Sequence, residues 1–450
     1  MEMMVSPLLL FVIALSIVIP MLFIVGVRYV AYRLAGRPES VHLPAADLLP
    51  IPVPRFASRW QVIRTLILVT ILGMGTGLVL LRYVYGIGEI SNLSNRFPWG
   101  IWIGFDVMGG VALAAGGFVM AALGHIFGQK RFEPLVRPAI LTGLLGYLLV
   151  IGGLMVDLGR PYNVWRPLVH WQHHSVMWEV GLCVATYTTV LFIEFLPVIL
   201  ERVNQFKPIP QRLPTVPLYR LLKKISIGFV ILGVVLSTLH QSSLGSLWVL
   251  APTKLSPLWY SLYLPLFFWL SAVAVGLAMT IVESTLSSKA FQRGLELHLL
   301  ADLARYAAIV LAIYLVAKLA DLALRGAWPL LFEPTLPAGA FWVEIGLGVI
   351  APMILFAQKP LRQKPAVLFS GALLVVLFGV VLNRLNVSLV GLWPYTGFIY
   401  FPSWMEIMVT LSLVTVGVLS FGLAARYLPV FNHPGHHPDP SDHCSPCYSR

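Results

Sequence analysis

Charged residues are scarce in this sequence, and their scarcity excludes an ordinary soluble protein. Asp, Glu, Lys and Arg make up 11% of the 450 residues, whereas soluble domains carry about 25%. Hydrophobic residues make up 58%, and the mean hydropathy is +0.83. The apolar runs are continuous rather than alternating, which favours membrane-spanning helices over a membrane barrel. We therefore predict an all-α integral membrane protein that crosses the bilayer many times.

Cysteine is also scarce, which excludes an iron–sulfur cluster in this chain. There are three cysteines, and such clusters normally take about four cysteine ligands. Cys183 lies within an apolar run and is interpreted as a small apolar side chain in the protein interior. Cys444 and Cys447 form a CxxC near the end of the chain. Any electron-transfer centre must therefore be a haem or belong to a partner subunit.

The few histidines in the apolar runs argue against haem. Two axial histidines must face each other from neighbouring spans, but His125 and His240 fall near opposite membrane faces. The residues beyond 428 are rich in histidine, aspartate and proline, and their ligand spacing matches no zinc template. We predict no haem and no metal site, and a disordered tail. Metal binding by this tail stays an alternative.

The net charge of +12 does not indicate nucleic-acid binding, because the basic residues alternate between connections instead of forming one stripe. The connections rich in Lys and Arg are 28–62, 124–137, 201–224, 285–305 and 358–365. The connections between them are poorer in these residues. The positive-inside rule places the basic set in the cytoplasm. The N-terminus is then outside and the C-terminus inside.

About eleven apolar runs are long enough to span a bilayer. They are 5–27, 63–82, 99–123, 136–157, 175–200, 225–241, 257–284, 304–324, 338–357, 366–385 and 403–427. A long Arg- and Pro-rich connection separates the first run from the others. We predict an accessory helix and basic linker over 1–62, a polytopic bundle of about ten transmembrane helices over 63–428, and a disordered tail over 429–450.

Ionisable residues inside the apolar runs fall mostly toward the outer face. They are Asp106, Asp157, Glu179, His240, Glu344 and Glu406. A charge in hydrocarbon costs at least ~2.5–3.5 kcal/mol even on insertion scales, so each predicts a functional site. The neighbouring polar and aromatic residues Arg160, Gln241, Ser242 and Trp404 are assigned to the same site.

Structural explanations remain open for several of these residues. Asp157 and Arg160 are about one turn apart and could form an ion pair that anchors a helix end. His240 could be a packing histidine, and Trp404 fits ordinary anchoring at the membrane interface. The glycines of run 99–123 could serve close helix packing or leave room for a flat ligand.

Two further groups lie elsewhere in the predicted spans. His125, Glu194 and Glu283 fall near cytoplasmic helix ends, where they either reach water by extending their side chains or form an inner proton path. Lys318 and Asp321 have i,i+3 spacing, and we expect them to neutralise each other.

The outer set matches what quinone chemistry requires. A quinone takes up two electrons and two protons, its carbonyl groups need hydrogen-bond donors, and its ring needs an apolar slot. Histidine and carboxyl side chains transfer protons near neutral pH. We therefore predict a quinone-binding and proton-transferring site at the outer face.

Four sequence runs resemble the NrfD/PsrC family, and most closely its HybB branch, the membrane subunit of uptake nickel–iron hydrogenases. They are Phe97–Asp106, Asp157–Pro161, His240–Ser246 and Tyr400–Trp404. The resemblance covers roughly 63–428. It implies a ten-helix anchor in the bacterial inner membrane, without a redox metal of its own. Asp106, Asp157, Arg160, His240 and Glu406 match the motifs and carry the implied role at quinone.

The resemblance also implies partners and a direction of electron flow. A periplasmic ferredoxin-like iron–sulfur subunit would connect this chain to the small and large subunits of a hydrogenase. Electrons from hydrogen would then reach menaquinone or ubiquinone as substrate, with proton movement as a further expectation. One alternative is the same anchor serving a polysulfide-, nitrite- or cytochrome c-linked complex. Another is a secondary transporter, which predicts inverted repeats and broken helices near the midplane.

Overall fold

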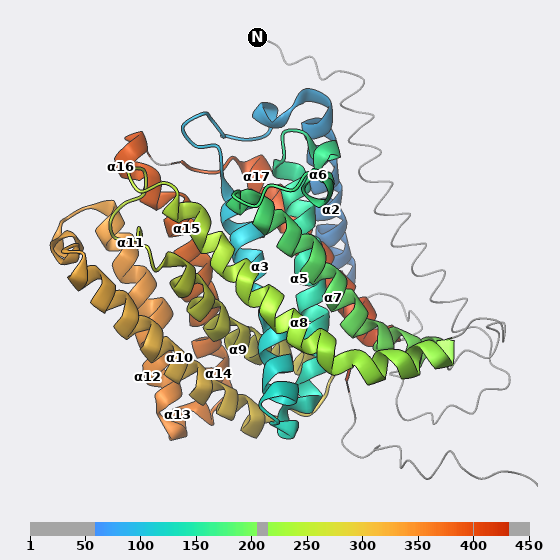
Figure 1. The fold of residues 1–450 in the computed structure, drawn as a ribbon. Coiled ribbons are helices and arrows are strands. Elements are labelled where there is room, and N and C mark those ends of the chain that lie inside the picture. The colour runs from blue at the N-terminus through green and yellow to red at the C-terminus, as the bar shows by residue number, and fades with distance from the viewer. Residues whose placement is uncertain (1–58, 205–214, 399, 432–450) are drawn as a thin grey trace, which may run out of the picture.

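The computed structural model describes residues 59–204, 215–398 and 400–431, and these residues form helices joined by short connections, without a β-strand (Figure 1). Ten helices in this part of the chain are long and apolar enough to cross a membrane. The predicted all-α polytopic fold is therefore confirmed for the described core. The predicted first span and most of the tail lie outside the described residues.

Five spans form the first half of the bundle. They are α2 (Arg59–Tyr85), a composite helix made of η2 (Trp102–Gly109), α3 (Gly110–Leu113), α4 (Gly116–Ala121) and η3 (Ala122–Ile126), then α5 (Glu133–Asp157), α7 (Val176–Asn204) and α8 (Thr215–Val249). The connections carry η1 (Ile87–Glu89), η4 (Lys130–Phe132), η5 (Pro161–Asn163) and α6 (Arg166–Val169).

The other five spans follow from residue 264. They are α9 (Leu264–Ala290), α10 (Leu297–Leu324), α11 (Leu336–Ile345) continued by η7 (Gly346–Ile350) and α12 (Ala351–Ala357), then α14 (Pro365–Leu374) continued by η8 (Val375–Val381) and α15 (Leu382–Ser388), and α17 (Trp404–Tyr427). The connections carry η6 (Trp328–Phe332), α13 (Lys359–Arg362), η9 (Val390–Leu392) and α16 (Trp393–Thr396).

The bundle has two ends, with α6 and α16 at one and α13 at the other (Figure 1). We call them the α6 end and the α13 end. The connections that the sequence analysis assigns to the outside lie at the α6 end. Helix α9 is the most enclosed complete helix, packing against α4, α8, α10 and α14. Helices α2 and α17 pack together at the edge.

Close glycine packing holds the composite helix against its neighbours. A Cβ at Gly116 would lie 3.3 Å from the Gly276 carbonyl oxygen, and one at Gly117 would lie 3.2 Å from that of Ala139. The backbones of α4, α5 and α9 therefore meet directly at these glycines. Of the two explanations for these glycines, packing is the one that the structure supports at Gly116 and Gly117.

The predicted end of the span 225–241 is wrong, because α8 continues to Val249. The Ser243 hydroxyl donates to the Leu239 carbonyl at 2.8 Å, and the Ser246 hydroxyl donates to that of Ser242 at 3.1 Å. Through these bonds each serine hydroxyl group finds an acceptor on its own helix, so the helix can continue through this polar run. His240 consequently lies about two turns inside α8 instead of at its end.

Candidate functional site

The structure divides the predicted outer residues into three groups instead of gathering them around one point. The first contains Asp106, Asp157 and Glu406, the second Glu179, His240 and Gln241, and the third Glu344. Among the described residues, no hydrogen bond or ion pair links a member of one group to a member of another. Each group is therefore considered by itself.

Asp106 lies on η2, where that helix packs between α5 and α17. Its Oδ2 accepts a hydrogen bond from the Thr410 hydroxyl at 2.7 Å. A Cβ at Gly153 would lie 2.8 Å from the Asp106 Cβ, so the absence of a side chain at 153 makes room for the carboxyl group. Gly153 on α5 thus leaves space for the buried Asp106 carboxyl group, whose one hydrogen-bond partner among the described residues is Thr410.

Glu406 has a structural role at the start of α17. Its Oε2 accepts from the backbone N–H groups of Ser403 at 2.8 Å and Asn92 at 3.0 Å, while the Ser403 hydroxyl accepts from the Glu406 N–H. This capping box satisfies N–H groups that a helix start leaves without partners. The Tyr400 hydroxyl donates to the other carboxylate oxygen. Burial and then this bond raise the pKa of Tyr400, which keeps it a donor.

Arg82, rather than Arg160, neutralises the end of α5. Buried Arg82 donates from Nε to the Val156 carbonyl oxygen at 2.6 Å and from Nη2 to that of Leu158. A cation at a helix C-terminus satisfies its last carbonyl groups and its dipole. Asp157 and Arg160 form no ion pair, and Arg160 is exposed. The Asp157 Oδ1 atom is buried without a partner among the described residues.

His240 is fully buried, and only one of its two ring nitrogens is occupied. The Tyr147 hydroxyl lies 2.9 Å from Nδ1, whereas Nε2 has no partner among the described residues. The next residue, Gln241, donates from Nε2 to the Val111 carbonyl oxygen at 2.9 Å, and its Oε1 is also without a partner. A buried polar atom without a partner is costly. The two free atoms therefore indicate a place for a polar ligand or water.

The surroundings of His240 combine aromatic and polar side chains. The Tyr147 ring contacts Tyr187 edge-on, with 4.7 Å between ring centroids. One turn toward the α6 end, the Ser243 hydroxyl, which also contacts the Leu239 carbonyl oxygen, lies 2.5 Å from Glu179 Oε1 and shares its single proton between the two oxygens. Tyr147 was missed in the sequence because a lone tyrosine in an apolar run carries no signal of its own.

The third group is a dense polar network between α9, α11 and α15. Three uncharged N–H donors point at the Glu344 carboxylate, from Trp259 at 2.9 Å, Asn386 at 2.8 Å and Asn383 at 2.7 Å. Arg384 donates to Asn383 Oδ1 at 2.6 Å. Arg384 was missed as a candidate, although a charge inside the run 366–385 was a readable signal.

The remaining predicted residues are not brought into these groups as ligands. Trp404 is 60% exposed, as an interfacial anchor would be, and the half-buried Ser242 side chain makes no hydrogen bond within the described part of the chain. The three inner residues lie apart, with Glu283 accepting from Thr142 at 2.6 Å and His125 lying 3.3 Å from the Ala121 carbonyl oxygen. Glu194 Oε1 is buried and has no partner in the part of the chain that the structure describes. Among the described residues, no three His, Cys, Asp or Glu side chains converge as metal ligands.

Comparison with known proteins identifies relatives of this chain. The family model described as polysulphide reductase, NrfD, matches residues 89–393. A protein from Nitratidesulfovibrio vulgaris is 42% identical over 376 residues, covering 81% of this chain and 93% of the relative. A probable Ni/Fe-hydrogenase 2 b-type cytochrome subunit from Escherichia coli is 34% identical over 362 residues, covering 78% and 88%. A menaquinone reductase integral membrane subunit from N. vulgaris is 28% identical over 377 residues, covering 77% and 86%.

Proposed function

The chain belongs to the NrfD family, and on that basis we propose that it is the quinone-reactive membrane subunit of a multi-subunit oxidoreductase. The resemblance predicted from the four sequence runs is thereby confirmed. Its relatives include the membrane subunits of a hydrogenase and of a menaquinone reductase, so redox partner subunits are common to both.

One observation carries the proposed quinone site. Within a bundle this apolar, His240 and Gln241 are consecutive residues of α8, and the buried Nε2 of the first and the buried Oε1 of the second have no protein partner among the described residues. Nε2 is the atom left to meet a quinone carbonyl oxygen or hydroquinone hydroxyl, because the Tyr147 hydroxyl occupies Nδ1. Since the hydrogen bond at one ring nitrogen sets what the other can do, the role of Nε2 is coupled to that of the Tyr147 hydroxyl: Nε2 donates when the hydroxyl donates to Nδ1, and accepts when the hydroxyl accepts from it.

Protons for quinone reduction would arrive from the α13 end. Ser237 and Gly233 lie three and seven residues before His240 on α8, so the three share one helix face. A Cβ at Gly233 would lie 3.6 Å from the Tyr187 ring and 3.2 Å from Glu194 Oε1, so the absence of a side chain at 233 leaves these two groups close to this face of α8. The hydroxyl groups of Ser237 and Tyr187 and Oε1 of Glu194 are all buried and make no hydrogen bond of good geometry among the described residues, although the Ser237 hydroxyl lies beside those of Tyr147 and Tyr187. Water bound to these atoms would connect Glu194 to His240 over roughly 10 Å.

The finer assignment follows the relatives. We propose that an iron–sulfur subunit docks at the α6 end, on the periplasmic side, and delivers electrons from a hydrogenase to menaquinone or ubiquinone. The E. coli relative supports hydrogen as the donor, and the menaquinone reductase subunit supports menaquinone as the acceptor. An anchor for another donor stays the alternative, and identification of the co-purifying subunits decides between them.

We further propose that the chain carries out this role without haem, although one relative is described as a b-type cytochrome subunit. A bis-histidine haem needs two histidines inside the bundle, and His240 is the only buried histidine among the described residues. A purified chain should show no b-type band in its reduced-minus-oxidised spectrum. A strong band in stoichiometric amount would refute this part of the proposal.

The proposed site is tested with His240→Ala in the assembled complex. Quinone reduction should fall at least ~100-fold, because general acid–base groups contribute about 10²–10⁴-fold. Reduction of an artificial dye by the same complex should be unchanged, since that reaction bypasses the membrane subunit. His298→Ala, which removes an exposed histidine at the α13 end, is the matched control. Wild-type quinone reduction in His240→Ala would remove the basis for this site.

A further inference from the structure

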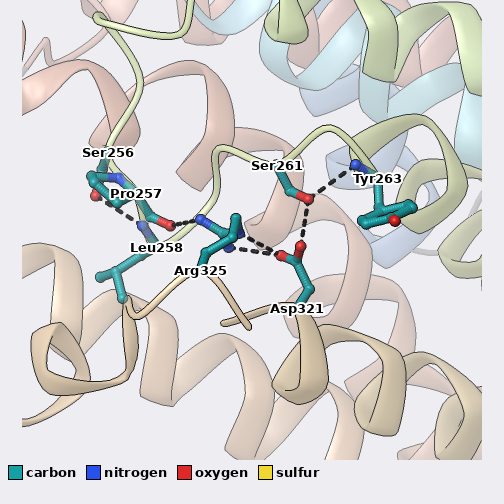
Figure 2. Close-up of polar contacts among 7 residues, drawn as sticks. All are labelled: Ser256, Pro257, Leu258, Ser261, Tyr263, Asp321 and Arg325. Carbon is teal, nitrogen blue, oxygen red and sulfur yellow. Dashed lines mark hydrogen bonds and ion pairs between the residues drawn. The ribbon is translucent and has the colours of Figure 1, made fainter. Parts of the chain in front are cut away.

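Lys318 on α10 is a buried cation that the quinone site leaves unexplained. It is 1% exposed, and its Nζ lies 5.2 and 5.9 Å from the ring centroids of Phe267 and Phe341. The expectation that Lys318 and Asp321 neutralise each other is wrong. The Asp321 carboxylate instead accepts from Arg325, at 2.7 and 2.9 Å, and from the Ser261 hydroxyl at 2.8 Å (Figure 2).

The charges around Lys318 do not balance. Glu344 is the one acidic group of the set and accepts three N–H donors, while Arg384 keeps its proton in any protein environment. With Asp321 already matched by Arg325, the buried set of Glu344, Arg384 and Lys318 holds two basic groups against one acidic group, so it carries at least one positive charge in excess as long as Lys318 is protonated. An unpaired buried charge is strongly unfavourable. Lys318 is the member of this set that can remove the excess, by releasing its proton.

One face of α10 connects Lys318 to the α6 end of the bundle. Tyr314, Lys318, Asp321 and Arg325 follow each other at spacings of four, three and four residues, which places them on one side of the helix. Asp321 is nearly buried, whereas the Arg325 side chain is 24% exposed. Along this face, the Asp321 carboxylate therefore lies between Lys318 and the α6 end of the bundle.

The connection between α8 and α9 closes this route. Residues 250–263 carry the fully buried Trp259, whose Nε1 donates to Glu344, and Arg325 holds the same connection by donating to the Pro257 carbonyl oxygen at 2.8 Å (Figure 2). The Ser256 N–H donates to the Gly391 carbonyl oxygen at 2.7 Å. Trp259 thus covers the polar network from the α6 end.

We propose that Lys318 is a proton-exchange site, separate from His240, that communicates with the α6 end through Asp321 beneath Trp259. Its N–H bond breaks to leave a neutral amine, and the proton passes by water along the Asp321 carboxylate. Glu344, Arg384, Tyr314, Asp321 and Arg325 are the titratable groups that act on Lys318 or flank it. The proposal rests on the proposed function only in that quinone turnover would drive the exchange.

The first test uses the complete complex in proteoliposomes with an entrapped pH dye. Lys318→Met and Lys318→Arg should both keep quinone reduction within about twofold of the wild type, while the protons moved per quinone fall to the level seen with an uncoupler. Lys254→Met, which removes an exposed lysine of the same connection, should leave both quantities unchanged. Normal proton movement in both Lys318 variants, or quinone reduction by the wild type without proton movement, would overturn the proposal and leave the quinone site intact.

The second test needs no turnover and so also applies if quinone reduction is absent. In Trp259→Ala, competitive acetylation at neutral pH followed by mass spectrometry compares Lys318 with Lys254. Only a neutral amine acetylates, so Lys318 should react at least as fast as exposed Lys254 once the covering indole is removed. Full labelling of Lys254 with none at Lys318 would mean a fixed, closed-off ammonium and would overturn the proposal.

Discussion

Glu344→Gln tests whether the network around Glu344 depends on an acceptor with two oxygens. Glutamine keeps the size of the side chain and replaces one oxygen with a donor. If the new NH₂ group takes the Oε2 position, it faces both Trp259 and Asn386. At the Oε1 position it faces Asn383 alone, so this orientation is the less costly of the two.

The cost of that better orientation follows from Asn383. Rotating the Asn383 amide would present an oxygen to the new NH₂ group, but this oxygen already accepts from Arg384 at 2.6 Å. The rotation therefore moves the missing bond to Arg384, whose Nε is already without a partner among the described residues. Losing one charge-assisted bond and leaving a buried donor unsatisfied costs about 2–4 kcal/mol.

The measurement is the free energy of unfolding of the purified chain, from titration with a denaturing detergent followed by tryptophan fluorescence. Glu89→Gln, at an exposed position near the α6 end, is the matched control and should change this free energy by less than about 0.5 kcal/mol. If Glu344→Gln proved as stable as the control, the three N–H donors would not need a carboxylate as their acceptor. Glu344 could then no longer be counted as the negative charge beside Lys318 and Arg384.

Two further substitutions examine the packing and capping that position these groups. Gly348→Ala places a methyl group against the backbone of Gly379, where η7 and η8 cross, and should destabilise the chain by at least about 1–3 kcal/mol. The same variant should weaken the Glu344–Asn383 hydrogen bond, because Glu344 lies one helical turn before Gly348. Gly339→Ala is the control in the same unfolding titration, because a Cβ at Gly339 would meet no other atom within 4 Å. Ser403→Ala removes the cap of α17 and should cost about 0.5–2 kcal/mol, with hydrogen exchange increasing in the first turn of that helix before elsewhere. Exchange that stays at the wild-type level there would contradict the capping role of Ser403.

Membrane spans were the part of this fold that the sequence predicted well. Each of the ten described spans overlaps one predicted run, because length and apolar composition along the chain are sufficient to locate them. The ends are predicted less well: α9 begins at Leu264 instead of 257, and α8 runs past its predicted end because serine hydroxyl groups bond back to their own helix. A polar run such as 241–246 is interpreted as a helix end when only its composition is considered.

The candidate site was predicted less completely than the fold. His240 was found because a histidine in an apolar run is conspicuous, but its partner Tyr147 is 93 residues away in sequence. Asp157 was expected opposite Arg160, yet the cation at that helix end is Arg82, from another helix. Glu406 proved to be the acidic member of a capping box, which the Ser403-x-x-Glu406 spacing could have indicated.

By itself the sequence determined that this protein spans the membrane as helices, where its basic connections lie, and which family it resembles. Each of these follows from properties that are read along the chain. Only the tertiary structure decided which buried polar groups meet, because that depends on which helix faces approach and how closely. The contact of Gly348 with Gly379 lets Glu344 reach Asn383, and the bond of Asp321 to Arg325 leaves Lys318 without its expected partner.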